Sequence, residues 1–155
     1  MTSAEAAQRS LARRLLEREA GEGRAAEELA AAAERACQKF YPQLARLIGA
    51  EGFHAVLARA LRLAQRESPF LAGVEGEPGG EVGARHAVPL LKGLREAVRG
   101  RDPAEVSDGV VAVFANLIWL LATFVGESVA LRQVSSIWPE VPLRDVEPGS
   151  GAVGE

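Results

Sequence analysis

Residues 109–126, with the sequence GVVAVFANLIWLLATFVG, contain no charged side chain. At 1.5 Å per residue, an α-helix of this length spans about 27 Å, slightly less than the hydrocarbon core of a bilayer. A helix that is apolar on all sides also forms the centre of soluble bundles. Asn116 and Thr123 lie inside the segment, Asp108 and Glu127 flank it, and no basic cluster adjoins it. We therefore expect a helix buried in a core or an oligomer interface, with membrane insertion as the alternative.

The rest of the chain also favours helices. Alanine, leucine, arginine and glutamate are abundant, and all four are strong helix formers because they lose little side-chain freedom in a helix. We predict an all-α fold, a single-domain helical bundle of about five helices with the apolar C-terminal helix at its centre. The predicted helices cover residues 3–20, 24–48, 50–67, 84–99 and 102–137.

The start of the last predicted helix carries the clearest local signal in the chain. Asp102 is expected to be the N-cap, because its carboxylate can accept hydrogen bonds from the first free backbone amides. Pro103 fits the first helical position, where a missing amide hydrogen has no cost. Glu105 then lies in the first turn, where the helix dipole favours a negative charge.

Glycines and prolines separate the predicted bundle from its flanks. Residues 1–23 are expected to form a mobile, mostly solvated N-terminal helix, residues 24–139 the bundle domain, and residues 140–155 a disordered tail. Residues 68–84 contain five glycines, two prolines and several glutamates, which predicts an acidic loop. The helix predicted at 84–99 is basic.

Charge and cysteine content exclude several classes of protein. A net charge of −3 and a pI near 5.5 argue against a dedicated nucleic-acid-binding domain. The N-terminus lacks the apolar run of a secretory signal, so we expect a cytoplasmic protein. Cys37 is the single cysteine, and the chain therefore has no internal disulfide.

Three polar residues interrupt the apolar segment or follow it directly. Asn116, Thr123 and Glu127 are spaced by seven and four, which places them on one face of a continuous helix. Buried polar groups must be hydrogen-bonded, because leaving one unpaired costs about 1–3 kcal/mol. We predict a structural hydrogen-bond network, with Glu127 either part of it or reaching solvent near Gly126 and pairing with Arg132. The alternative is a small-molecule pocket, with Trp119 as a further lining residue.

The same segment is expected to make helix–helix contacts. Ala122, Gly126 and Ala130 are spaced by four, a pattern that permits close helix approach but also arises by chance in an alanine-rich chain. We expect a homodimer, or a complex with another helical protein. The predicted contact residues are Leu117, Leu120, Phe124, Gly126 and Leu131, with Trp119 beside them.

Residues that commonly carry chemistry are few. Cys37 lies in an alanine-rich helical segment and is expected to be a small core residue. His54 and His86 are the two histidines, and neither has metal-ligand spacing to another histidine or to the cysteine. No phosphate-binding loop or nucleophile motif is present. We therefore predict no metal site, no cofactor and no catalytic residue.

His86 leaves one further function open. It precedes Leu91-Lys92-Gly93 and in this respect resembles histidine-phosphotransfer domains, in which the histidine lies close to a Leu-Lys-Gly run. Here two more residues intervene, one of them Pro89, so that Lys92 would lie roughly on the opposite face of a helix. Histidine phosphotransfer stays an alternative function.

Two segments carry a resemblance to a known group of proteins. Residues 120–139 (LLATFVGESVALRQVSSIWP) and 40–49 (FYPQLARLIG) resemble an uncharacterised family of bacterial all-helical proteins, over residues 40–139. The resemblance implies a bacterial, soluble and non-enzymatic protein, and it implies no site residue.

We therefore expect a non-enzymatic regulatory or adaptor module that acts through helix-mediated protein association. Two alternatives come from other functional classes. One is a small-molecule or signal-sensing domain with a pocket inside the bundle. The other is a membrane-associated helical protein.

Overall fold

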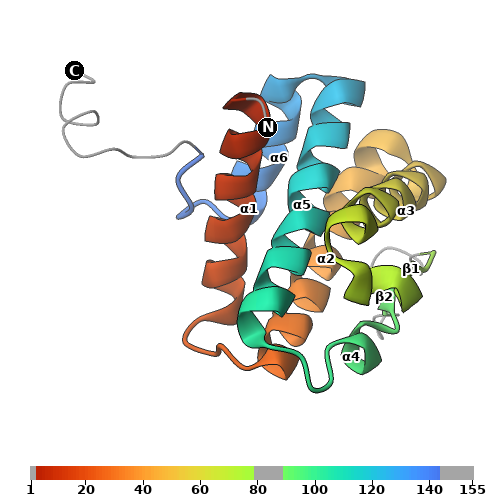
Figure 1. Cartoon of the computed structure of the whole chain (residues 1–155). Helices are drawn as coiled ribbons and strands as arrows, with labels where there is room; N and C mark the ends of the chain where they lie inside the picture. Colours follow the sequence, from red (N-terminus) through yellow and green to blue (C-terminus); the bar gives the residue numbers. More distant parts are fainter. Residues whose placement is uncertain (1–2, 79–88, 144–155) are drawn as a thin grey trace, which may run out of the picture.

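The computed structural model describes residues 3–78 and 89–143 and shows an all-α helical bundle, which confirms the predicted fold class (Figure 1). Short elements between α3 and α4 form a 3₁₀ helix and an antiparallel ribbon of two-residue strands. In chain order, the elements are α1 (Ser3–Ala20), α2 (Ala26–Ile48), α3 (Ala50–Glu67), η1 (Pro69–Gly73), β1 (Glu75–Gly76), β2 (Leu91–Lys92), α4 (Leu94–Ala97), α5 (Pro103–Val125) and α6 (Glu127–Ile137).

The apolar helix α5 is the centre of the bundle. It packs against α1, α2, α3 and α6, and Figure 1 shows α1 and α3 on opposite sides of it. Among the described helices α5 is long and apolar enough to cross a membrane, yet 61% of its apolar window is buried inside the protein. Its start is as predicted, because the Asp102 side chain accepts a hydrogen bond of 3.1 Å from the Ala104 amide. The charge-free segment is therefore a core helix of one chain.

Aromatic side chains fill the space between α2, α5 and the end of α6. The Phe40 ring stacks on Phe114 with a centroid distance of 5.9 Å, and its edge contacts Trp138 at 5.1 Å. All three side chains are buried. They join the last helix to the centre of the bundle, with aromatic contacts that add to the hydrophobic burial.

Gly126 divides the predicted helix 102–137 into two. Its φ of +96° and ψ of 149° lie in a region that only glycine adopts readily. Gly49 separates α2 from α3 with similar angles, φ +84° and ψ 158°. The predicted single helix is therefore wrong, and Ala122, Gly126 and Ala130 do not form a stripe on one helix. Ala130 is instead fully buried within the chain.

The N-terminal helix α1 is part of the bundle. It packs against α5 and α2, and Leu11, Ala12, Leu15 and Leu16 are all buried. The expectation of a mostly solvated helix is thus corrected. The apolar stripe of α1 is thin in the sequence. It is nevertheless sufficient to dock the helix, because α5 offers an apolar surface on every side. Of the predicted tail, residues 144–155 lie outside the described residues.

The predicted basic helix 84–99 is also corrected. Leu91–Lys92 form β2, which pairs antiparallel with β1 in the register Glu75 with Lys92 and Gly76 with Leu91. Gly93 follows with φ +88°, and among the described residues 89–99 only Leu94–Ala97 are α-helical. The Leu-Lys-Gly run is therefore not on a helix, which removes the pattern behind histidine phosphotransfer. His86 itself lies outside the described residues.

Polar side chains from α2 and α3 hold this ribbon in place. The Glu34 carboxylate accepts hydrogen bonds from the Leu90 and Leu91 amides, at 2.9 and 3.0 Å. A ring nitrogen of His54, Nε2, lies 3.0 Å from the Gly76 carbonyl oxygen. These contacts satisfy backbone groups that a two-residue strand leaves unpaired.

Candidate functional site

The predicted polar face of α5 is not a shared network. The Asn116 side-chain amide donates to the Ala112 carbonyl at 2.8 Å, and the Thr123 hydroxyl donates to the Trp119 carbonyl at 2.9 Å. Glu127 lies beyond the break at Gly126, in α6, and is exposed. The structure therefore does not bring Asn116, Trp119, Thr123 and Glu127 around one pocket, because two of these side chains bond to their own helix and the helix ends before Glu127.

The predicted contact residues divide between core and surface. Leu117 and Leu120 are buried in the single chain, so neither is available to a partner of the folded protein, and the expectation for these two is corrected. Leu131 is half-buried against the core, and Gly126 is exposed. Phe124 is 67% exposed, the largest exposed fraction among the large hydrophobic side chains of the described residues.

The helix breaks at Gly49 and Gly126 share a local sequence pattern. Leu44–Gly49 reads LARLIG and Leu121–Gly126 reads LATFVG, so both segments combine leucine, alanine, two further apolar residues and glycine at matching positions. In both, the leucine at the first position is buried, whereas the residue two positions before the glycine is exposed. These exposed residues are Leu47, 41% exposed, and Phe124. Each helix therefore ends with a large apolar side chain in water.

Two of the predicted ligand-binding residues do line a cavity. Asn116 and Trp119 border a surface cavity of about 350 Å³ between α1, α3 and α5. Trp119 is 40% exposed. We call this cavity the Gln8 pocket; its other lining residues are Glu5, Gln8, Arg9, Leu63, Glu67 and Ala115. Sequence analysis missed the contributions of α1 and α3, since nothing in the sequence placed those helices beside α5 in this register.

Hydrogen bonding in the Gln8 pocket is incomplete. Arg9 Nη2 donates to both carboxylate oxygens of Glu67, at 2.8 and 3.0 Å, and this ion pair joins α1 to α3. Gln8 is only 8% exposed, and its side-chain oxygen Oε1 is buried without a hydrogen-bond partner. A buried acceptor of this kind costs about 1–3 kcal/mol of stability. Such a group calls for a physical reason, because most buried polar atoms are paired.

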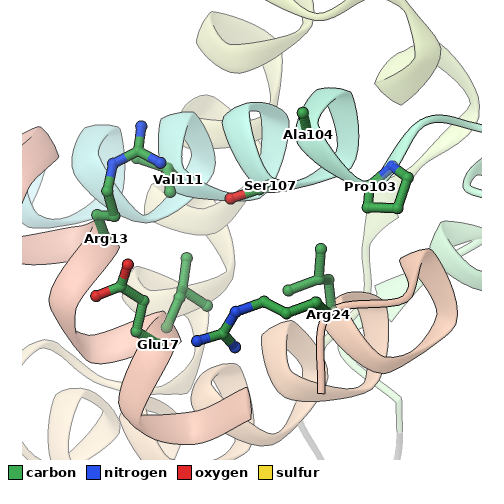
Figure 2. Close-up of a pocket in the computed structure, with 9 residues that line it drawn as sticks. Arg13, Glu17, Arg24, Pro103, Ala104, Ser107 and Val111 are labelled. Atoms are coloured by element: carbon green, nitrogen blue, oxygen red, sulfur yellow. The ribbon is translucent and has the colours of Figure 1, made fainter. Parts of the chain in front are cut away.

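A second cavity, of about 180 Å³, lies where α1 and the start of α2 meet the first turns of α5. Figure 2 shows Arg13 and Glu17 of α1, Arg24, and Ser107 of α5 around it. Arg24 donates to the Gly21 and Gly23 carbonyls at 2.7 and 3.0 Å, and Arg13 lies 3.5 Å from the Asp108 carboxylate. Both cations therefore already have partners within the chain, and we assign this cavity no site.

A third cavity, of about 680 Å³, lies between α2 and α4. Its lining includes Glu34, Lys92, Arg95 and Glu96. It also includes Pro89, which directly follows the undescribed residues 79–88. We therefore assign it no site.

A buried carboxylate at Glu19 connects α1, α2 and the end of α6. Its side chain is 5% exposed and accepts hydrogen bonds from Lys39, from Arg35 Nε at 3.3 Å and from Trp138 Nε1 at 3.0 Å. Burial alone would raise the pKa of this carboxyl group. The hydrogen bonds from Lys39, Trp138 and Arg35, together with the charge of Lys39, outweigh burial, so that the pKa is lowered below its usual value of 4.5.

Cys37 is a core residue, as predicted. It is fully buried, and burial raises the pKa of its thiol well above the usual range, with the Glu34 carboxylate adding to the shift. Because the thiolate is the reactive form, this position is unsuited to nucleophilic chemistry. Among the described residues, no group of three or more His, Cys, Asp and Glu side chains is arranged to hold a metal ion.

We expect Cys37 in the native protein to resist thiol-modifying reagents. In native buffer the reagent should label only a small fraction of the chains in the time that is sufficient to label all chains in denaturant. The reason is that the thiol is both buried and protonated. Mass spectrometry after timed labelling measures both rates. Rapid, complete labelling of the native protein would contradict the placement of Cys37 in the core.

Comparisons with protein-family models, curated proteins and solved structures find no match to this chain.

Proposed function

We propose that the protein is a non-enzymatic regulatory or adaptor module that acts by association of two copies, through the surface at the α5–α6 corner. We define this corner as residues 123–127. The observation that supports the proposal is the exposure of Phe124, 67%, at the end of an otherwise buried helix. Full burial of one such side chain contributes about 1.5–3 kcal/mol. A cytoplasmic location and a bacterial origin belong to the same proposal.

The composition of the corner favours a second copy as the partner. Thr123, Phe124, Val125 and Gly126 carry no charge, and Glu127, at the edge of the corner, is its one charged residue, so the patch around Phe124 is uncharged. An uncharged apolar patch complements itself, whereas a patch with one sign of charge requires a partner of the opposite sign. In a twofold dimer the same patch meets itself, which places Phe124 of each copy near the symmetry axis.

Phe124 is expected to act as the hot spot of a larger contact. Stable interfaces bury about 800 Å² on each partner, more than a single side chain provides. A central aromatic residue surrounded by weaker contacts is the usual distribution of binding energy. Half-buried residues beside the corner, such as Ala122 and Leu131, supply surrounding surface.

Size-exclusion chromatography with light scattering tests the proposal. The wild-type chain is expected to elute with twice its mass of 16.4 kDa, and Phe124→Glu with the mass of one chain, because the dimer would bury two unpaired carboxylates. Ala72→Glu, which adds the same charge at an exposed position in η1, serves as the control and should stay dimeric. Equal masses for the wild type and Phe124→Glu would overturn the proposal.

A further inference from the structure

Three arginines of α3 have no partner within the described part of the chain. Arg59, Arg62 and Arg66 are exposed, and none of their side chains forms a hydrogen bond or an ion pair with a described residue. No acidic residue occurs between residues 52 and 66, so this stretch carries three positive charges. The α3 arginines therefore contribute no ion pair to the fold. Cations of α1 and α2, by contrast, pair with carboxylates of the chain; these are Arg9, Arg13, Arg18, Arg35 and Lys39.

The same three arginines lie on one face of α3. They are three and four residues apart, the spacings at which side chains are neighbours on a helix surface, and like charges at these spacings disfavour the helix. A guanidinium is a planar donor of paired hydrogen bonds, which suits it to the carboxylates of another molecule. A row of unpaired arginines with a local cost is therefore better explained by a partner than by the stability of α3.

This arginine face borders the Gln8 pocket. Leu63 of α3 lines the pocket together with Trp119 of α5. Arg59 is four residues before Leu63 and Arg66 is three residues after it, so both arginines are neighbours of Leu63 on the helix surface. They lie about one turn to either side of it, since a helical turn rises about 5.4 Å. Leu63 therefore has a cation on each side along α3.

Trp119 adds an exposed aromatic side chain to this surface. It is 40% exposed although most of α5 is buried, and it borders the same cavity of about 350 Å³. Leu63 is half-buried and lines this cavity as well. Tryptophan and arginine are enriched in protein–protein interfaces and are over-represented among the residues that carry the binding energy. The surface therefore combines an apolar centre with cationic flanks.

We propose that this surface binds an acidic amphipathic helix of a partner protein. An apolar side chain of that helix contacts Trp119 and Leu63. Carboxylates one turn before and one turn after the apolar side chain pair with Arg59 and Arg66. Recognition of this kind, an amphipathic helix laid against an apolar depression with charged flanks, is a recurring mode of peptide binding. Complementary charge gives it orientation and partner choice.

The spacing of the cations favours a helix over other polyanions. Carboxylates one turn to either side of an apolar residue lie on the same side of a helix, which matches the order Arg59, Leu63, Arg66 on α3. The carboxylates of Glu5 and Glu67 line the cavity too, and they would repel a phosphate polymer or an anionic bilayer that covered the whole surface. The net charge of −3 acts in the same direction.

The proposed dimer does not enter this inference. Phe124 is five residues after Trp119, which places the two side chains about 140° apart around α5. Phe124→Glu is therefore expected to bind the acidic helix with the affinity of the wild-type chain, whatever its own mass in solution. Loss of helix binding in Phe124→Glu would overturn the assignment of the site.

Titration of the full chain with designed peptides tests the proposal. The probes are peptides of about 15 residues, long enough to form a helix, with leucines on one helix face and glutamates one turn to either side. The set moves the glutamates stepwise around the leucine face. Control peptides carry lysine in place of every glutamate, or the same residues in scrambled order, and should bind at least about tenfold more weakly. No binding of any glutamate peptide at near-millimolar concentration, or equal binding of either control, would overturn the proposal.

Polyuridylate and phosphatidylserine vesicles serve as the competing polyanions. At physiological ionic strength we expect neither to displace the glutamate peptide, because both would meet Glu5 and Glu67 as well as the arginines. Tighter binding of either one than of the glutamate peptides would overturn the proposal and assign the arginines to a nucleic acid or a membrane surface.

Arginine variants locate the binding on α3. Arg59→Gln with Arg66→Gln should weaken the glutamate peptide about tenfold, the sum of two exposed ion pairs, and leave the melting temperature unchanged or slightly raised. Arg46→Glu, which changes the net charge by the same two units at an exposed position of α2, should keep the affinity. Arg59→Glu with Arg66→Glu should prefer the lysine peptide. A double glutamate variant that still prefers the glutamate peptide would overturn the pairing.

Trp119→Phe gives a spectroscopic test of the apolar centre. Trp119 borders the cavity, whereas Trp138 is buried in the core. A peptide without tryptophan should therefore change the tryptophan emission of the wild-type protein and leave the emission of Trp119→Phe unchanged. A change of the same size in the variant would place the binding elsewhere and overturn the proposal.

Discussion

Gly109→Ala is expected to destabilise the protein by about 1–2 kcal/mol, although alanine is normally the better residue inside a helix. A Cβ at this position of α5 would lie 2.7 Å from two ring carbons of Phe70. Phe70 is buried in η1, and its ring also lies under the Arg101 guanidinium, 5.6 Å from the ring centroid. Because Phe70 is buried, its ring has little free space to move into. The overlap therefore outweighs the gain of about 1 kcal/mol in helix propensity.

Urea unfolding measures this effect, with Gly52→Ala in α3 as the matched control. At Gly52 the three atoms nearest to a new Cβ all belong to the flexible Ile48 side chain, at 3.2–3.6 Å, so the control should be much closer to neutral. Phe70→Leu removes the ring, and adding Gly109→Ala to that variant should cost less than in the wild type. A stabilising effect of Gly109→Ala in the wild type would show that η1 does not pack on α5 at this position.

Glu19→Gln is expected to lower the free energy of unfolding by about 1–3 kcal/mol at pH 7, because it replaces a charged acceptor of three hydrogen bonds with a neutral one. Lys39 and Arg35 are about half-exposed, and solvent screening limits what their ion pairs contribute. The Trp138 indole N–H is buried and has Glu19 as its acceptor, so this bond accounts for most of the loss.

The effect of Glu19→Gln should depend on pH in one direction. The pKa of Glu19 is lower in the folded protein than its usual value of 4.5, so the ionised carboxylate favours folding above that value. The stability difference between wild type and variant should be constant from neutral pH to about pH 5. It should then shrink as the pH falls below 4.5 and through the folded pKa, since protonation removes the charge in the wild type as well.

Urea unfolding at a series of pH values gives this difference directly. Glu140→Gln, which removes an exposed ion pair with Arg18, serves as the control and should change stability by less than about 0.5 kcal/mol at every pH. A difference for Glu19→Gln that grows on acidification would contradict the lowered pKa.

The sequence was sufficient to predict the centre of the fold. A segment without charges between 109 and 126 required extensive burial, and the structure places it at the middle of the bundle. The start at Asp102 was predictable because capping is a local interaction between a side chain and amides two or three residues away. The helix-forming composition gave the all-α class for the same reason, since propensity is a local property.

Elements that depend on distant contacts were not predictable. Gly126 permits either a bend or a break, and the choice rests on the burial of Ala130, Val134 and Trp138 against other helices. Residues 90–92, Leu-Leu-Lys, are good helix formers. However, Glu34 binds the backbone amides of Leu90 and Leu91, and β1 supplies a strand partner. Here tertiary contacts override the local preference.

The candidate site was predictable only in part. Asn116 and Trp119 stood out as a polar and an aromatic residue in an apolar helix, and both line the Gln8 pocket. The burial of Gln8 could not be predicted, because a glutamine in a helix with many charged residues is normally expected to be solvated. Its burial follows from the way α1 packs on α5, with Arg9 reaching Glu67 at the end of α3, which no local pattern encodes.

The mass of the wild-type chain in solution tests the central claim, that this protein acts by association of two copies. Sedimentation equilibrium over micromolar to near-millimolar concentrations measures it without a surface or a label. The account predicts a reversible approach to twice 16.4 kDa as the concentration rises. A mass of 16.4 kDa at every concentration would contradict it.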